Sequence, residues 1–179
     1  MSHYQLHSKF NLIIILPIFV GILYFYFTRD LYNLAFFLLA FVYSTLYAHP
    51  DMDMANQIKL FSFYGFMTLP YRLFYSPFFK HRGKVSHSLL WGTPSRLFAL
   101  LFFIGIIVLI YLLSEKIWTE SLNKENLKLV FFELLYILYF AFIDLFRLIK
   151  INYAQCLYFI LGFYIADFGH ILLDRLSRR

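Results

Sequence analysis

Residues 12 to 27 read LIIILPIFVGILYFYF, and this apolar run decides the fold class of the chain. A helix needs about 20 mostly apolar residues to cross a bilayer. The run resembles a signal peptide, but Thr28, Arg29 and Asp30 follow it where a small-x-small cleavage site would stand, and a second apolar run follows them. We therefore predict an all-α, polytopic membrane bundle with four or five apolar helices, at about residues 11–27, 31–48, 97–113, 129–146 and 151–173.

The composition supports this prediction. Hydrophobic residues make up 61% of the chain and the mean hydropathy is +0.68, whereas soluble domains are about half apolar. The net charge of +6 could suggest nucleic-acid binding, but the basic residues are scattered between apolar runs. Contact with anionic headgroups explains them more simply. We expect membrane lipid as a partner, and no nucleic acid.

Residues 49–96 interrupt the apolar pattern with prolines, glycines and charged residues. We predict an interfacial segment there, with its Tyr and Phe side chains at headgroup depth. Its last part, HRGKVSHSLLWGTPSR from His81 to Arg96, is the stretch of the chain richest in reactive side chains. We treat residues 1–179 as a single integral membrane domain in which residues 49–96 carry a metal site.

Ionisable side chains in or beside a membrane are costly, which makes them functional candidates. Imidazole and carboxylate ligands together suit zinc first, with manganese or iron as alternatives. Four clusters of such residues occur: His7; His49, Asp51 and Asp53; His81 and His87; and Asp167, His170 and Asp174.

The spacing supports these clusters unequally. His170 and Asp174 are i,i+4, and Asp167 is three residues before His170, so one helix face can present all three. Asp51 could be a ligand, a helix cap or part of a solvated turn. His81 and His87 are six residues apart, so they form a ligand pair only if a turn brings them together; otherwise they lie among headgroups.

Two arginines allow two interpretations. Arg82 and Arg96 could hold an anionic substrate through paired hydrogen bonds, or could anchor the chain at lipid phosphates. The predicted topology adds a difficulty, because five full crossings would place Asp174 on the face opposite His81. Either one run does not cross fully, or the site lies within the bundle, or the C-terminal histidine and acid are not part of it.

One ordered pattern of polar residues covers nearly the whole chain and reads His7; Pro50, Asp51, Asp53; Pro70, Tyr71, Arg72; His81, Arg82; Ser86, His87; Gly92, Thr93, Arg96; and His170, Asp174. This pattern resembles a family of metal-binding membrane proteins of unknown function, related to the LexA-regulated, membrane-bound, predicted metal-dependent hydrolases. That family commonly has His-Asp at the position of His7-Ser8, and a serine at the position of His49.

The resemblance implies a helical membrane protein with a divalent metal site. Its ligands would be His7, Asp51, Asp53, His81, His87, His170 and Asp174. The leading hypothesis is a metal-dependent hydrolase, in a bacterial cytoplasmic membrane, that acts on a phosphorylated or lipidic ester at the membrane surface. A free carboxylate, Asp53 or Asp167, would serve as general base, and Arg82 or Arg96 would neutralise developing negative charge. The alternatives are a non-catalytic structural or regulatory metal site and a metal ion transporter, so enzymatic activity stays open.

Overall fold

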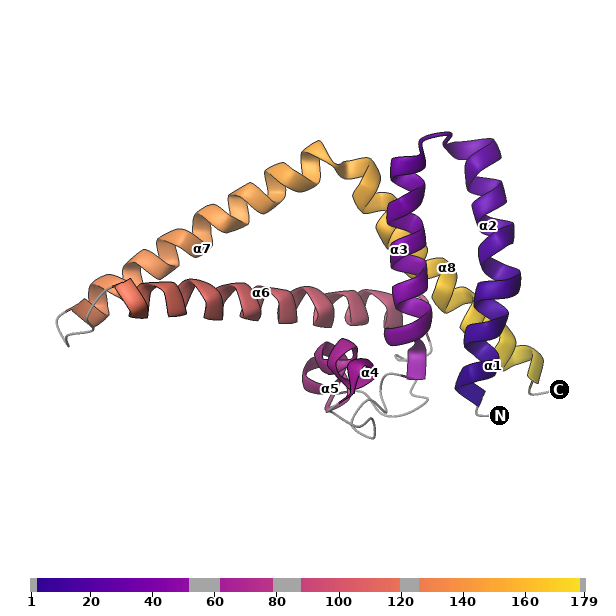
Figure 1. Ribbon diagram of the computed structural model, residues 1–179, viewed down its shortest axis with the longest axis horizontal. Coiled ribbons are helices and arrows are strands. Elements are labelled where there is room, and N and C mark those ends of the chain that lie inside the picture. The colour runs from indigo at the N-terminus through magenta and orange to yellow at the C-terminus, as the bar shows by residue number, and fades with distance from the viewer. Residues whose placement is uncertain (1–2, 52–61, 79–87, 120–125, 178–179) are drawn as a thin grey trace. The chain divides into compact units, whose positions relative to one another are not determined.

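The computed structural model describes residues 3–51, 62–78, 88–119 and 126–177, and Figure 1 shows their helices. Helices account for 88% of the described residues, and no strand occurs among them, so the all-α prediction is confirmed. The chain divides into two compact units, one of residues 1–100 and 154–179 and the other of residues 101–153. The single membrane domain stays a prediction.

The first helical stretch runs from α1 (His3–Phe10) through η1 (Asn11–Ile15) and α2 (Leu16–Ile22) to η2 (Leu23–Phe27). Pro17 lies in the first turn of α2, directly after the π-helical η1. A proline lacks an N–H and its ring crowds the carbonyl four residues earlier, and a wider π-helical turn before it leaves the ring more room. Because the stretch begins at His3 and not near residue 11, His7 lies on a helix.

The helix α3 (Leu31–Tyr47) returns antiparallel to α2 and packs against it (Figure 1). Thr28 has an extended backbone that ends η2, and the Asp30 carboxylate caps α3 by accepting a hydrogen bond of 2.9 Å from the Tyr32 backbone N–H. This cap satisfies a donor that the first turn of a helix leaves unbonded. The predicted helical pair at residues 11–27 and 31–48 is therefore present as a hairpin.

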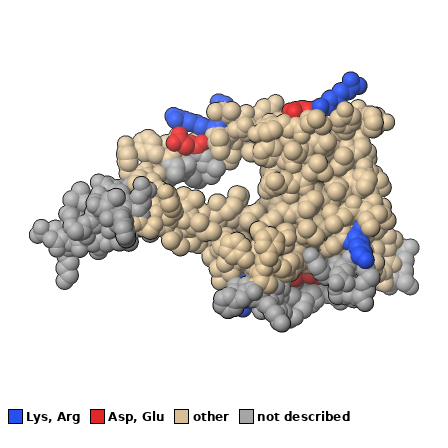
Figure 2. Space-filling view, in the orientation of Figure 1, with Lys and Arg blue, Asp and Glu red and all other residues tan. Residues whose placement is uncertain are grey.

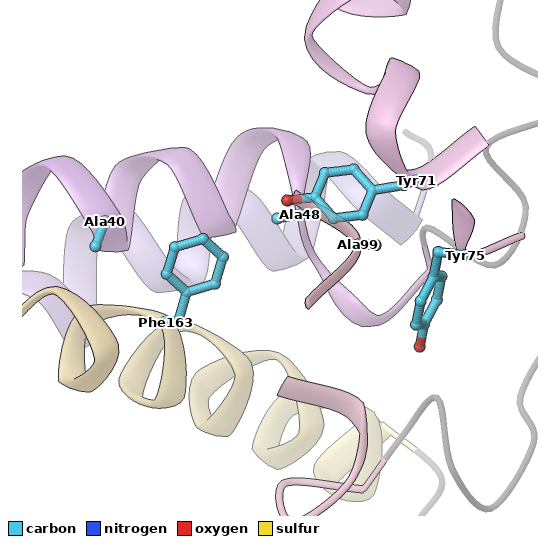
Figure 3. Packing of buried hydrophobic residues seen from close by; sticks show 6 residues of the cluster. All are labelled: Ala40, Ala48, Tyr71, Tyr75, Ala99 and Phe163. Carbon is cyan, nitrogen blue, oxygen red and sulfur yellow. The ribbon is translucent and has the colours of Figure 1, made fainter. Parts of the chain in front are cut away.

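Two short helices, α4 (Phe63–Met67) and α5 (Leu69–Phe74), lie in the predicted interfacial segment. Phe63 and Phe66 are exposed there, and Tyr71 and Tyr75 are fully buried. These two rings pack in a core cluster that includes three alanines, and the depth of the segment in a membrane stays a prediction. Figure 3 shows this cluster, which consists of Ala40, Ala48, Tyr71, Tyr75, Ala99 and Phe163.

Three long helices follow: α6 (Gly92–Thr119), α7 (Asn126–Ile151) and α8 (Tyr153–Ser177). All three extend beyond the predicted runs, and α6 begins at Gly92, which makes Thr93 and Arg96 residues of its first two turns. In the first unit, α8 packs closely on α3. A Cβ placed on Gly162 of α8 would lie only 2.5 Å from the Phe37 carbonyl oxygen, so this contact needs a glycine.

Within the described residues, three helical stretches are long and apolar enough to cross a membrane, namely Leu6–Phe27, Gly92–Leu112 and Tyr153–Ser177, and Leu31–Tyr47 is a shorter apolar helix. Large apolar side chains such as Ile13 and Phe25 are 70% and 74% exposed. On the face seen in Figure 2, uncharged side chains cover most of the described surface and the charges form small, separate patches. Such a surface suits a membrane protein. Three candidate spans are found, and the predicted four or five are not confirmed.

Candidate metal centre

Three ligand atoms meet where the start of the first helix contacts the end of α8. The Nε2 atom of His7 lies 3.2 Å from Asp174 Oδ1, and His170 Nε2 lies 3.9 Å from the other carboxylate oxygen of Asp174. These three residues each offer one ligand atom, and the atoms all lie within 4.8 Å of one another. Two imidazoles and one carboxylate therefore form a first group that can hold a metal ion.

A second group uses the residues that follow α3. His170 Nε2 lies 3.3 Å from Asp51 Oδ2, and the same carboxylate oxygen lies 3.9 Å from His49 Nδ1. The ligand atoms of His49, Asp51 and His170 also lie within 4.8 Å of one another. His170 belongs to both groups, so the two groups form one continuous cluster, which we call the His–Asp cluster: His7, His49, Asp51, His170 and Asp174.

The three imidazole rings of the His–Asp cluster are stacked. The ring of His170 lies between those of His7 and His49, with centroid distances of 4.1 Å and 5.6 Å. Burial lowers the pKa of His49 well below its ordinary value, the neighbouring His170 lowers it further, and Asp51 opposes the shift. His49 is therefore neutral at physiological pH, and a neutral imidazole is the form that binds a metal.

Each group has one ligand separation that matches the spacing of ligands around a bound ion. Nitrogen and oxygen ligands lie about 2.0–2.2 Å from zinc, so two ligands on a tetrahedral ion are separated by roughly 3.3 Å. The separations of 3.2 Å for His7 and Asp174 and 3.3 Å for His170 and Asp51 agree with that value, whereas His170–Asp174 and His49–Asp51 are longer, at 3.9 Å each. The residues present therefore fit a divalent metal in both chemistry and spacing.

Burial is graded across the His–Asp cluster. The side chains of His170, His7 and His49 are only 2%, 4% and 6% exposed, whereas those of Asp51 and Asp174 are 26% and 20% exposed. The imidazoles therefore form the inner wall of the cluster. The carboxylates lie on its accessible side.

A buried ion pair joins α6 to α8 one helical turn before His170. The Asp167 carboxylate accepts hydrogen bonds from the Arg96 guanidinium and from the Thr93 hydroxyl. Both Arg96 and Asp167 are fully buried, and Arg96 also donates to the Tyr75 hydroxyl over 3.4 Å. The interpretation of Arg96 as a headgroup anchor is therefore wrong, because its guanidinium lies inside the first unit.

Asn11 joins the first helix to α8 and α3. Its amide nitrogen donates to the Ala166 carbonyl over 2.8 Å and to the Thr45 hydroxyl over 3.4 Å. A Cβ placed on Gly169 would lie 2.0 Å from Asn11 Oδ1, so this helix contact depends on a glycine. Because Asn11 is one turn after His7 and Ala166 is one turn before His170, this contact holds the two histidines together.

The structure brings four of the predicted ligands together: His7, Asp51, His170 and Asp174. Their assignment as metal ligands stays a prediction. Arg96 forms a buried ion pair with Asp167, so Asp167 is not the free carboxylate that a general base would need. The predicted residues Asp53, His81, Arg82, Ser86 and His87 lie outside the described residues.

Sequence reasoning gave little weight to His49 and none to Asn11. The signal for Asn11 is its i,i+4 spacing from His7, which puts the two on one helix face once the helix is known to begin at His3. His49 is two residues before Asp51, directly after an apolar helix, where a buried polar residue needs a partner.

The contact between His7 and Asp174 also limits the number of times the chain can cross a membrane between them. Five full crossings would put these two residues on opposite faces of a membrane, yet their side chains are 3.2 Å apart. If the chain crosses a membrane, this contact requires an even number of crossings between them. The contact also favours the inclusion of His170 and Asp174 in the site, which the sequence alone left open.

Helix ends that converge on a His–Asp cluster define a helical protein with a candidate metal site. The chain belongs to the family of uncharacterised metal-binding proteins (DUF2227), whose model matches residues 3–179. No curated protein and no solved structure matches the chain. Membership of a metal-binding family and the geometry of the His–Asp cluster agree that this chain has residues able to hold a metal ion.

Proposed function

We propose that this chain is a membrane-embedded, metal-dependent hydrolase that acts on a phosphorylated or lipidic ester at the membrane surface. The observation that carries the proposal is the His–Asp cluster, in which His170 is shared by two groups of three ligands. A relation to the LexA-regulated hydrolases belongs to this proposal, as does a place in a bacterial cytoplasmic membrane. Zinc is the first choice of metal, and manganese or iron are the alternatives.

The graded burial of the cluster favours a catalytic site over a structural one. Structural zinc sites are closed by four protein ligands, whereas catalytic sites combine three protein ligands with an open position. The first group offers two histidines and one carboxylate, and its carboxylate is the more exposed member. A substrate could therefore approach from the side of Asp51 and Asp174.

The roles of the protein side chains follow from this arrangement. His7, His170 and Asp174 would hold one ion, and His49 and Asp51 would extend the site around His170, with Asp53, His81 and His87 as further predicted ligands. A bound divalent ion supplies Lewis acidity and makes water more acidic, so that a nucleophile exists at neutral pH. Asp53 as general base, and Arg82 or Arg96 as neutralising cations, stay part of the proposal, although Arg96 would have to leave its buried ion pair with Asp167 to reach a substrate.

Metal analysis of the purified protein tests the site. Wild type reconstituted with zinc should hold stoichiometric metal, and His170→Ala should lose it because both groups lose a ligand. His49→Ala should keep the first group. Asp30→Asn is the matched control, since Asp30 is an exposed acid whose capping role asparagine can keep. A full complement of metal in the His170→Ala protein would contradict the assignment.

Activity is tested separately. Phosphoester and carboxylic-ester lipid analogues in detergent should be cleaved by the zinc-loaded wild type, and chelation followed by zinc addition should abolish and then restore turnover. Wild type that binds metal but cleaves neither kind of ester would overturn the hydrolase proposal. It would leave a structural or regulatory metal site.

A further inference from the structure

A hollow lies beside the His–Asp cluster, on the neighbouring face of α8. Its volume is about 380 Å³, and apolar side chains including Leu90, Phe168 and Leu172 line it. Two polar side chains, Ser88 and Arg175, belong to the same lining. The hollow therefore combines an apolar floor with one cation and one hydroxyl.

The hollow and the cluster share the same turns of α8. Ile171 and Arg175 line the hollow, and each directly follows a residue of the cluster, His170 and Asp174. Successive helical residues are about 100° apart around the axis, so these two i,i+4 pairs form adjacent stripes. A ligand in the hollow would lie next to the carboxylate side of the cluster.

The surroundings of the hollow have the features of a membrane interface. Leu90 is 77% exposed and Trp91 is 69% exposed, immediately before the candidate span that begins at Gly92. Arg175 is exposed in the last turn of α8, near the end of the candidate span Tyr153–Ser177. Exposed tryptophan and arginine at the ends of apolar helices are typical of headgroup depth.

We propose that this hollow binds an anionic phospholipid. The Arg175 guanidinium donates hydrogen bonds to the lipid phosphate, the Ser88 hydroxyl donates to a headgroup oxygen, and an acyl chain lies along Leu90, Phe168 and Leu172. Charge complementarity selects the anionic lipid, because Arg175 is the charged residue in the described lining. This proposal also names the substrate class of the proposed hydrolase, a phospholipid presented to the His–Asp cluster. That part of it rests on the proposed function.

Quenching of Trp91 fluorescence tests the site directly. The chain has two tryptophans, so Trp118→Phe leaves Trp91 as the reporter beside the hollow. The protein is placed in mixed phosphatidylcholine and phosphatidylglycerol vesicles in which only one lipid carries brominated acyl chains. The preference for phosphatidylglycerol, measured as relative quenching, should fall by about fivefold in Arg175→Gln, the value expected for one cation near a lipid surface.

Controls separate this site from general surface charge. Arg29→Gln removes another exposed cation and should leave the preference unchanged, and Arg175→Lys should keep most of it. An unchanged preference in Arg175→Gln would overturn the proposal. So would recovery of fluorescence on adding inorganic phosphate, which would indicate a soluble ligand, or an absence of quenching by either lipid, which would indicate that protein covers the hollow.

The failure of this proposal can be told from failure of the proposed function. All quenching is measured in the presence of a chelator, so it does not depend on bound metal. If hydrolysis occurs, Arg175→Gln should raise KM for phosphatidylglycerol analogues more than it lowers kcat. A lipid preference without any hydrolysis would overturn only the hydrolase function.

Discussion

Two arginine–aspartate pairs in this chain share their chemistry and differ in their surroundings. Arg96 and Asp167 are both fully buried and are separated by 71 positions in the sequence. Arg147 and Asp144 are 73% and 67% exposed, lie 3.3 Å apart and are neighbours on one helix, α7. The same two functional groups therefore join distant segments in the buried pair and lie on the surface of one helix in the exposed pair.

The difference teaches where the energy of an ion pair comes from. In an exposed pair, each charge gives up favourable hydration for an attraction that solvent screens, so the pair contributes little to the free energy of unfolding. A buried pair has lost its hydration in both side chains, so removing one partner leaves an uncompensated charge in the interior. Asp167 of the buried pair lies one turn from His170. Breaking the pair should therefore disturb the metal site as well as lower the stability.

The largest expected effect comes from breaking the buried pair. Arg96→Met should lower the free energy of unfolding by about 3–5 kcal/mol, because the Asp167 carboxylate stays buried without its cation. Thermal or denaturant unfolding in detergent, followed by circular dichroism, measures the change. The double variant Arg96→Met with Asp167→Leu should recover much of the loss, since it removes both charges. A double variant less stable than the single one would show that the charge itself is not the cause.

The next effect sharpens the contrast between close and open packing. In Gly162→Ala the new Cβ meets the backbone of α3, with the Phe37 carbonyl oxygen at 2.5 Å, so the helices must separate. Overpacking of this kind costs about 1–3 kcal/mol, and contact with backbone favours the upper end. Gly21→Ala is the matched control, because nothing lies within 4 Å of its Cβ, and it should be neutral or stabilising. Equal losses in the two variants would refute this account.

Much of this arrangement follows from local patterns in the sequence. The i,i+4 spacing of His170 and Asp174 predicts a shared helix face, and the residues after the second apolar run identify Asp51 as a candidate. The pairing of Arg96 with Asp167 has no such signal, because no periodicity connects residues 71 positions apart. His49 has no such signal either, because it becomes a candidate ligand only through its contact with His170 of α8. The number of membrane crossings could not be predicted from the sequence either, because the length of an apolar run does not determine whether its helix crosses the membrane.

A smaller effect concerns the buried hydrogen bonds of Asn11. Asn11→Ala removes its bonds to the Ala166 carbonyl and the Thr45 hydroxyl, at 2.8 Å and 3.4 Å, and should cost about 1–2 kcal/mol of stability. The variant should also weaken zinc binding, because Asn11 holds His7 near His170. Zinc titration by calorimetry beside an unfolding curve measures both effects. A loss of stability with unchanged zinc affinity would mean that Asn11 does not position the ligands.

The smallest effect should come from breaking the exposed pair. Arg147→Met removes the same charge as Arg96→Met, but water solvates Asp144 in its place, so the change in the free energy of unfolding should stay below about 1 kcal/mol. Raising the ionic strength should shrink even this difference, because salt screens exposed charges and reaches buried ones much less. Unfolding curves of the wild type, Arg147→Met and Arg96→Met at low and high salt therefore measure the comparison directly. A salt-sensitive loss in Arg96→Met would mean that the interior pair is reached by solvent, and the contrast between the two pairs would then fail.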